Sequence, residues 1–266
     1  PVRMALLTGG TKAGRKKQLQ AALKQGELDI VVGTHALIEE SVGSERLGLA
    51  VGDEQHRFGV MQRDALRGKG GSPHLLVMTA TPIPRTLALT VYGDLDVSQL
   101  DEMPPGRQPI ETHFVAPEER DTVYKKVREE IASERQVFVI CPLVEESDAI
   151  EAKSAVAEFA RLRDEVFPEF ADRMRLLHGH MKTSEKDEAM SDFRNGGASI
   201  LVSTAVVEVG VDVPNATVMV IEGADRFGLS QLHQFRGRVG RAEHQSYCFL
   251  LSESDGEPAR KRLTLM

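Results

Sequence analysis

The sequence lacks several features that would place it in other classes of protein. No run of about 18 apolar residues occurs in the chain, which excludes an ordinary membrane-spanning helix. The amino-terminal stretch holds no apolar segment long enough for a secretory signal. The 2 cysteines, Cys141 and Cys248, lie outside any Cys-x-x-Cys or Cys/His cluster. We therefore expect reduced thiols in a cytoplasmic protein, with neither a disulfide framework nor a zinc site.

An excess of positive charge is also missing. The chain has 33 basic and 40 acidic residues and a net charge of −7, which argues against a protein that coats nucleic acid by bulk attraction. Hydrophobic residues make up 41% of the chain, enough for buried cores. At roughly 150 residues per domain, the 266 residues predict about two domains.

Short apolar stretches alternate with helical patterns. The predicted strands are Met4–Thr8, Asp29–Thr34, Leu47–Gly52, Leu75–Thr79, Gln136–Val144, Met174–His178, Ser199–Ser203, Thr217–Glu222 and Ser246–Leu251. The predicted helices are Arg15–Gln25, Glu118–Ser133, one around Ala155–Leu162, Glu185–Arg194 with Ser184 opening a capping box, and one near Ser230–Val239. Because the strands are apolar throughout, the pattern predicts an α/β fold whose parallel sheets are covered on both faces.

A proline-rich segment divides the chain. Asp101–Thr112 holds three prolines and a glycine, which suit neither a helix nor a central strand. We predict a first lobe at 1–105, a linker at 106–112, a second lobe at 113–255 and a last segment at 256–266. No internal repeat is strong enough to indicate duplication.

Two acidic residues, Asp53 and Glu54, directly follow a predicted strand. Ligands of parallel α/β sheets bind at the carboxyl ends of strands. One carboxylate there can hold Mg²⁺, and the next can orient an attacking water. A solvated acidic turn explains the pair equally well. Thr79–Thr81 ends another predicted strand, and its small hydroxyl groups can hydrogen-bond to phosphate or to backbone, although an ordinary loop would look the same.

Arginines are concentrated in Gln234–Arg241, which holds three of them with two glycines. The planar guanidinium matches two phosphate oxygens at once. We expect Arg238 and Arg241 near one face of a helix, where both could reach a single anion as arginine fingers do. The alternative is a basic surface helix that binds nothing specific.

Weaker signals accompany these motifs. Gly210 permits close backbone approach, and Asp212 could accept a hydrogen bond from a ribose hydroxyl. Small residues follow several strands and offer backbone N–H groups that can bind nucleic-acid phosphates without net positive charge. These residues are Thr8, Gly9, Gly10, Gly33, Thr34, His178 and Gly179.

The order of the motifs resembles that of superfamily 2 helicases. It runs from D-E-x-H at Asp53 through T-A-T at Thr79 and S-T…G-x-D from Ser203 to Q-x-x-G-R-x-G-R at Gln234. Longer stretches resemble the RecG family of bacterial DNA helicases, which remodel replication forks. They are Asp53–Arg63, Met78–Arg107, Val139–Ser147, Leu176–Met190, Ser203–Thr217 and Arg226–Arg241. The translocase Mfd shares TATPIPRTL and RGRVGR, but the YGDLDVS tract at Tyr92–Ser98 favours the RecG family.

The resemblance implies two tandem RecA-like motor lobes, the first truncated at its amino terminus. Residues 1–105 would then be the later part of the first lobe, and 256–266 the start of a following segment. It implies that Asp53 holds the Mg²⁺ of ATP and that Glu54 activates water. Gln234, Arg238 and Arg241 would face the triphosphate. It further assigns Gly210 and Asp212 to the nucleotide, His56 and Thr79, Ala80 and Thr81 to coupling, and Thr8, Gly9, Gly10, Gly33, Thr34, His178, Gly179 and Thr204 to the DNA face.

The chain has no G-x-x-x-x-G-K-[ST] loop for the triphosphate. The resemblance places that loop before Pro1 and predicts that the chain is inactive alone, within an ATP-dependent DNA helicase that acts on forks, Holliday junctions and single strands. We expect a cytoplasmic, nucleoid-associated monomer without membrane contact, with single-strand-binding protein as a partner. The alternative is a non-catalytic nucleic-acid-binding or structural module that lost the loop. Intact Glu54, Arg238 and Arg241 favour the enzyme.

Overall fold

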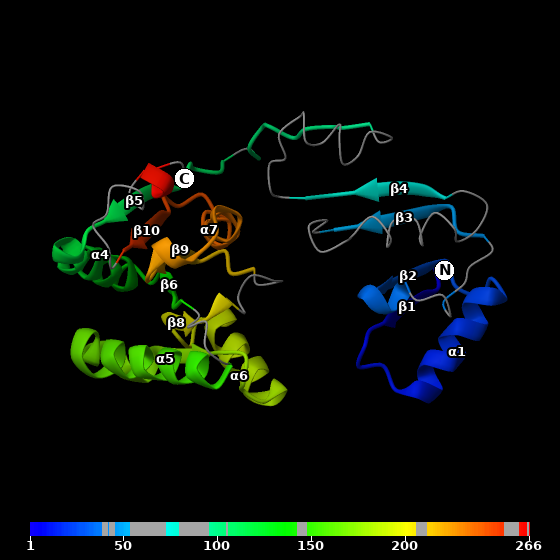
Figure 1. Cartoon of the computed structure of the whole chain (residues 1–266), viewed down its shortest axis with the longest axis horizontal. Helices are drawn as coiled ribbons and strands as arrows, with labels where there is room; N and C mark the ends of the chain where they lie inside the picture. Colours follow the sequence, from blue (N-terminus) through cyan, green and yellow to red (C-terminus); the bar gives the residue numbers. More distant parts are fainter. Residues whose placement is uncertain are drawn as a thin grey trace. The chain divides into compact units, whose positions relative to one another are not determined.

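The chain folds as two α/β units (Figure 1). The computed structural model describes residues 1–38, 42, 46–53, 73–79, 96–104, 106–142, 148–205, 212–252, 261–264 and 266. Contacts divide the chain into Pro1–Val91 and Tyr92–Met266. The lobe limits expected from the sequence remain predictions, and each unit is described by itself.

A six-stranded sheet is the framework of the second unit. Its order is β5-β10-β9-β6-β8-β7, and every neighbouring pair is parallel. The strands are Glu111–Val115 (β5), Gln136–Ile140 (β6), Met174–Leu177 (β7), Ile200–Ser203 (β8), Ala216–Ile221 (β9) and Tyr247–Leu251 (β10). The predicted buried parallel sheet is confirmed here. β6 ends four residues before its expected limit, and β7 to β10 begin and end within one residue of theirs.

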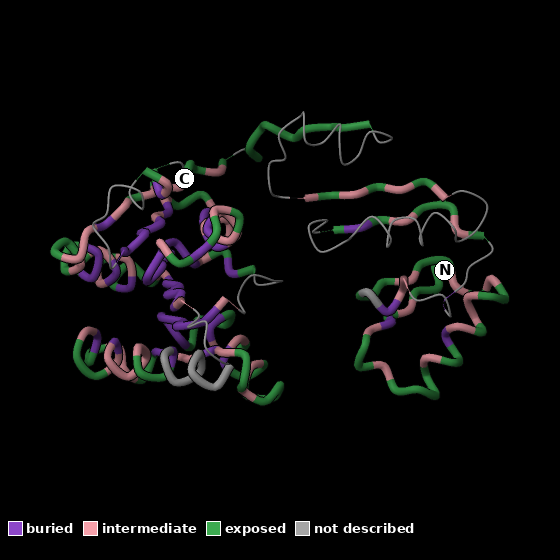
Figure 2. The backbone as a smooth tube through the Cα atoms, in the orientation of Figure 1, coloured by how far each residue is buried: buried purple, intermediate pink, exposed green. Residues whose placement is uncertain are grey.

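Helices cover both faces of this sheet. They are Arg120–Ala132 (α4), Asp148–Arg161 (α5), Thr183–Arg194 (α6) and Leu229–Arg236 (α7). Successive side chains of a strand point to opposite faces, so β6 feeds both layers. Val137 and Val139 pack in the cluster that contains α4, whereas Phe138 and Ile140 pack in the cluster that contains α6 and α7. The central strands are buried while the helices keep exposed outer sides (Figure 2).

Strand β5 overlaps the end of the predicted linker, since its first two residues are Glu111 and Thr112. It is an edge strand, paired only with β10 among the described strands. Exposed and partly buried residues alternate along its first four positions, and only Val115 is buried. An edge strand needs no continuous apolar run, so the sequence of β5 gives only a weak strand signal. The nearby prolines therefore led to the prediction of a linker at these residues.

The start of α6 differs from the predicted capping box. Thr183 is its first residue, and Ser184 lies inside the helix. The Glu185 carboxylate accepts a hydrogen bond from the Lys182 backbone N–H at 2.9 Å. The acidic half of the expected motif is therefore Glu185, and Asp187 plays no part in it.

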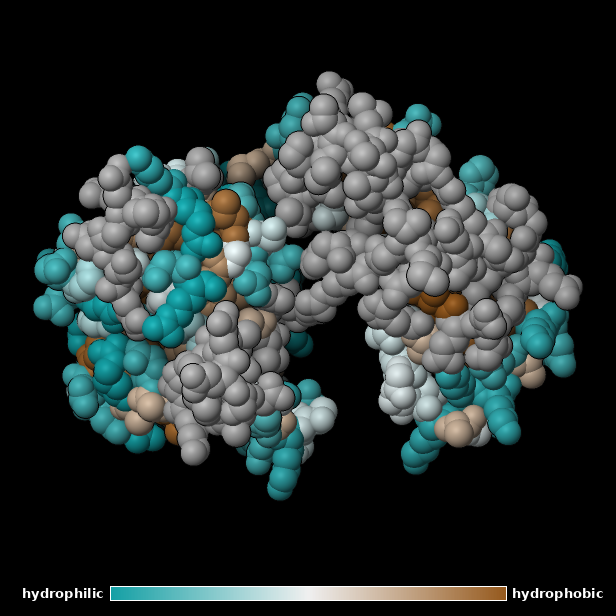
Figure 3. Space-filling model, in the orientation of Figure 1, coloured by the Kyte–Doolittle hydropathy of each residue, from teal (hydrophilic) through white to brown (hydrophobic). Residues whose placement is uncertain are grey.

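The first unit contains two described two-stranded parallel sheets. Met4–Leu7 (β1) pairs with Ile30–Gly33 (β2), and Leu49–Gly52 (β3) pairs with His74–Val77 (β4). Ala13–Lys24 (α1) connects β1 to β2, and hydrophilic side chains gather over it in Figure 3. Its inward face contributes Leu19 to a small core with Leu7.

Part of this unit's apolar surface is left uncovered by the described residues. Met4 and Leu6 are 66% and 64% exposed, and alternate residues of β2, β3 and β4 are exposed in the same way. Most residues of the corresponding strands of the second unit are buried. The first unit thus has less of its apolar surface covered than the second.

The segments β1–α1–β2 and β7–α6–β8 share one plan. Met4 and Met174 begin them, and every element of the second follows its counterpart at a constant spacing of 170 residues. Leu7 pairs with Gly33 as Leu177 pairs with Ser203. The two segments therefore share a structural plan, although the sequence shows no repeat strong enough to indicate duplication. Few identities survive outside the apolar and turn positions, which hid the correspondence.

Candidate nucleotide and nucleic-acid sites

The first unit brings two predicted site residues to one sheet edge. Gly52 ends β3 beside Val77 at the end of β4, and the Met78 N–H donates to the Gly52 carbonyl at 2.8 Å. Asp53 and Thr79 follow these strand ends. Asp53 is exposed, and a single accessible carboxylate fits a hydrated Mg²⁺, which keeps part of its water shell. Glu54, His56, Ala80 and Thr81 lie outside the described residues.

Helix α7 ends earlier than predicted. Leu232 and Phe235 anchor it in the core, and the helix stops at Arg236 with Gly237 as its cap. Arg238 and Arg241 therefore lie in the loop that follows, not on one helix face. We call Gly237–Glu243 the arginine loop. A glycine, Gly240, supplies the positive φ of +71° that turns the chain there.

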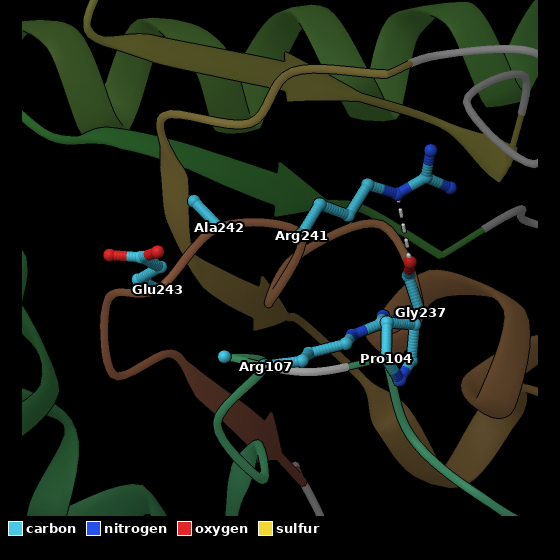
Figure 4. A pocket seen from close by; sticks show the side chains of 7 residues that line it. Pro104, Arg107, Gly237, Arg241, Ala242 and Glu243 are labelled. Atoms are coloured by element: carbon cyan, nitrogen blue, oxygen red, sulfur yellow. Dashed lines mark hydrogen bonds between the residues drawn. The ribbon is translucent and has the colours of Figure 1, made fainter.

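The arginine loop presents Arg241 to Asp212. The Arg241 Nη1 lies 2.9 Å from Asp212 Oδ1, and the Arg241 Nε donates to the Gly237 carbonyl at 3.3 Å (Figure 4). The two side chains are 30% and 65% exposed. An ion pair this exposed contributes only about 0–1 kcal/mol, so the guanidinium can leave it for a phosphate at little cost. Two residues assigned to the nucleotide are thus in direct contact.

The structure shows fewer contacts for the other residues assigned to the nucleotide. Gln234 and Arg238 are half-buried, and the Arg238 N–H donates to the Phe235 carbonyl at 2.9 Å. Arg236, the third arginine of the motif, is occupied elsewhere, since its guanidinium bonds to the Met266 carbonyl and to His233. Gly210 lies outside the described residues.

The residues assigned to DNA occupy equivalent places in the two units. Thr8 and Thr34 follow β1 and β2, and His178 and Thr204 follow β7 and β8. The Thr34 N–H donates to the Leu7 carbonyl at 3.3 Å, and the Thr204 N–H donates to the Leu177 carbonyl at 3.2 Å. Each unit therefore gathers its own set at the carboxyl edge of two adjacent strands. The full sets are Thr8, Gly9, Gly10, Gly33 and Thr34 in one unit, and His178, Gly179 and Thr204 in the other.

The turns after β1 and β7 leave backbone groups available. The Thr11 N–H donates to the Thr8 carbonyl at 3.1 Å, and the Met181 N–H donates to the His178 carbonyl at 3.2 Å. Gly9, Gly10 and Gly179 lie exposed within these turns. Across the part of the chain that the structure describes, their N–H groups have no hydrogen-bond partner. Such groups suit contacts with a phosphate backbone.

A buried ion cluster at the end of β9 was missed by sequence reasoning. Glu222 is 6% exposed, and its Oε2 lies 2.9 Å from Arg120 Nη1, while Arg161 Nη2 lies 4.0 Å from the other oxygen. Burial raises the pKa of the Glu222 carboxyl, and Arg120 opposes this rise. Glu222 follows β9 as Asp53 follows β3, but two guanidinium groups surround it. The only signal in the sequence was a glutamate directly after an apolar strand.

Comparison with known proteins finds similar helicases. The profile of the helicase conserved C-terminal domain matches residues 119–243. The chain is 57% identical over 98% of its length to the ATP-dependent DNA helicase RecG of Synechocystis sp., and 51% identical over 100% to that of Bacillus subtilis. A solved structure of RecG bound to a three-way DNA junction matches the whole chain with 46% identity and a TM-score of 0.72.

The chain belongs to the RecG family. Its fold is therefore the RecA-like α/β arrangement that the motifs implied. The chain spans 31% and 39% of the length of the Synechocystis and Bacillus relatives, and 34% of the matched structure. Among the helices that the structure describes, none is long and apolar enough to cross a membrane.

Proposed function

We propose that the chain is the motor segment of an ATP-dependent DNA helicase that remodels stalled forks and branched DNA. The proposal rests on the arginine loop, where Arg241 meets Asp212 at 2.9 Å in a weakly held pair. An arginine whose backbone is held in a loop, but whose guanidinium is only loosely paired, is suited to stabilise a phosphoryl group during transfer. A family relative bound to a three-way DNA junction supports branched DNA as the substrate.

Each unit contributes different chemistry to the proposed reaction. Asp53 would hold Mg²⁺, which supplies charge neutralisation to the phosphates, and Glu54 would orient and deprotonate the attacking water. Gln234, Arg238 and Arg241 would contact the triphosphate, and Gly210 with Asp212 would contact the rest of the nucleotide. His56 and Thr79, Ala80 and Thr81 would relay the nucleotide state to the DNA contacts.

The proposed DNA grip uses both equivalent turns. Exposed N–H groups at Gly9, Gly10 and Gly179 would bind phosphates, together with the side chains after the adjacent strands. Contacts of this kind need no net positive charge, which agrees with the −7 of the chain. They also suit a motor that must release and rebind DNA in each cycle. A monomeric state, single-strand-binding protein as a partner and a cytoplasmic, nucleoid-associated location remain predictions.

Sheet topology supports the need for a further strand in the first unit. In the second unit, β6 lies between β8 and β9 and pairs with both. In the described part of the first unit, β2 pairs only with β1, and β3 pairs only with β4. A strand at the position of β6, followed by a phosphate-binding loop, would join the two small sheets. We infer that the active protein needs this element, which the described residues do not supply.

The test is ATP turnover by the full-length protein that contains the chain. We expect DNA to stimulate turnover, and Arg241→Ala to lower kcat by about 10³-fold, as loss of an arginine finger does. Glu54→Gln should abolish turnover because the water loses its base. Arg128→Ala, which removes a surface guanidinium paired with Glu169, serves as the matched control. Full turnover in both Glu54→Gln and Arg241→Ala would refute the assigned roles.

A further inference from the structure

We propose that Arg107 is a positioning residue for the arginine loop. The proline-rich segment before β5 would then help to hold Arg238 and Arg241 in position. We call Pro104–Ile110 the proline segment. The inference rests on the proposed function, because it names a residue that prepares Arg238 and Arg241 for the nucleotide. It assigns a role to a segment that the sequence predicts to be mainly a linker.

A direct hydrogen bond joins the two segments. The Arg107 Nε donates to the Gly240 carbonyl at 2.6 Å, across 133 positions of the chain. That carbonyl belongs to the planar peptide unit that leads into Arg241, so holding the oxygen fixes the orientation of the Arg241 N–H. Arg107 is half-buried and carries a full positive charge, which makes the bond shorter and stronger than a neutral one. Its loss would free the peptide unit next to the proposed finger.

The local backbone holds Arg107 in place for this contact. The Arg107 N–H donates to the Pro104 carbonyl at 3.2 Å, and Gly106 has a φ of +83°, which glycine adopts without strain. The turn faces Glu243, the last residue of the arginine loop, whose Oε1 would lie 3.6 Å from a Cβ on Gly106. A cavity of about 340 Å³ lies between the two segments and is lined by Arg107 and Arg241 (Figure 4).

Two further contacts fasten the proline segment to the same loop region. A Cβ on Gly240 would lie 2.7 Å from Ile110 Cγ1, so the backbone of Gly240 packs directly against Ile110. The Gln245 Nε2 donates to the Pro109 carbonyl at 2.9 Å. Contacts at Arg107, Pro109 and Ile110 thus fix successive parts of one segment on the loop. The proline segment is therefore held against the arginine loop within the second unit, and the Arg107 guanidinium contacts the backbone beside Arg241.

The experiment measures two quantities, the kinetics of ATP turnover and the amide hydrogen exchange of the arginine loop without ligand. In the full-length protein, we expect Arg107→Ala to lower kcat for ATP by about 10-fold through misplacement of the fingers. We expect KM to stay within a factor of about 2, because ground-state binding changes little. In the isolated chain, the same variant should speed amide hydrogen exchange in residues 237–243. Arg107→Lys should restore most of both values, since a lysine can replace a single donor to a carbonyl.

Arg128→Ala is the control, because Arg128 also donates to a backbone carbonyl, that of Val166. It should change neither kcat nor exchange in residues 237–243. Wild-type exchange in Arg107→Ala, or an equal loss of kcat in Arg128→Ala, would overturn the role of Arg107. A wild-type protein without ATP turnover would instead refute the proposed function. The exchange measurement would still show whether the bond from Arg107 to the Gly240 carbonyl orders the arginine loop. Should Arg107→Ala lower the melting temperature strongly, Arg107→Gln gives the same comparison with a milder change.

Discussion

Arg241 combines a fixed backbone with a loosely held side chain. The Gly240 carbonyl before it is held by Arg107 at 2.6 Å, whereas its guanidinium is held by an exposed ion pair with Asp212 and a 3.3 Å hydrogen bond to the Gly237 carbonyl. A residue built in this way can exchange one anionic partner for another without reorganising the fold. Glu222 shows the opposite arrangement, since its carboxylate is buried between guanidinium groups and cannot exchange partners freely.

The two cysteines provide a test of burial at the residue scale. Cys141 and Cys248 are 1% and 0% exposed, and burial raises the pKa of both thiols, that of Cys248 to about 12. We expect neither thiol to react with iodoacetamide in the native chain at pH 8, because only the thiolate is nucleophilic. Mass spectrometry should find both alkylated in denaturant. Rapid native alkylation of either cysteine would contradict the described packing.

The same pKa shifts set a pH dependence of stability. Below about 8.5, the usual thiol pKa, both the folded and the unfolded chain keep these protons. Above it, only the unfolded thiols ionise, so these groups lower the free energy of unfolding as the pH rises toward the folded value of about 12 for Cys248. Replacing Cys248 with alanine should make this alkaline loss smaller in urea titrations at increasing pH.

At the scale of single residues, the sequence singles out candidates where a motif carries chemistry, and their roles remain predictions; it gives no sign of residues whose role depends on a distant contact. Asp53, Asp212, Arg238 and Arg241 could be named because their types and spacing are unusual. The bond from Arg107 to Gly240 joins residues 133 positions apart, and no local pattern reports such a contact. Glu222 was missed for the same reason, since it follows a strand and its partners Arg120 and Arg161 come from two helices far away in the sequence.

The elements of the second unit are held together by charge as well as by apolar packing. Arg120 begins α4 and Arg161 ends α5, so the cluster around Glu222 ties both helices to the carboxyl end of β9. Breaking a buried ion pair leaves an unpaired charge in a poorly solvated place. The cluster therefore fixes one helical layer on the sheet.

Replacing Glu222 should have a large effect on the stability of these elements. We expect Glu222→Ala to lower the free energy of unfolding by about 3 kcal/mol, because two guanidinium groups lose their buried partner. Glu169→Ala is the control, since Glu169 pairs with Arg128 at 2.6 Å on the surface and should cost less than about 1 kcal/mol. Urea unfolding of the chain measures both. Equal losses would contradict a structural role for the Glu222 cluster.

Apolar periodicity predicted most elements, and their ends less well. Buried strands such as β6 and β9 are continuous apolar runs and could be recognised directly. Strand β5 was missed because an edge strand is only partly buried. Helix α7 was predicted too long because Val239 continues its apolar pattern, although that residue packs in the core from the loop. Tertiary packing, and not local preference, decides these boundaries.

The two units of the molecule differ in how completely their sheets are covered. Alternate apolar residues of β1 to β4 are exposed among the described residues, while most apolar strand residues of the second unit are buried. We expect hydrogen exchange of the isolated chain to show strong protection in β6, β8 and β9 and weak protection in β1 to β4. Equal protection of all these strands would contradict the need for a further strand in the first unit.

The chain alone should also lack the activity of its longer relatives. It has no phosphate-binding loop of the usual sequence, so we expect no DNA-stimulated ATP hydrolysis from the purified 266 residues. Phosphate release with and without branched DNA measures this directly. Robust hydrolysis by the isolated chain would show that another part of it binds the triphosphate. The full-length protein, assayed in parallel, confirms that the conditions support turnover.

Conversion of a labelled three-way DNA junction by the full-length protein tests the central claim most directly. We predict that the wild-type protein separates the junction strands with ATP, that ADP does not support the reaction, and that Glu54→Gln abolishes it while junction binding persists. A protein that hydrolyses ATP without converting the junction, or a Glu54→Gln variant that converts it as fast as the wild type, would contradict the account.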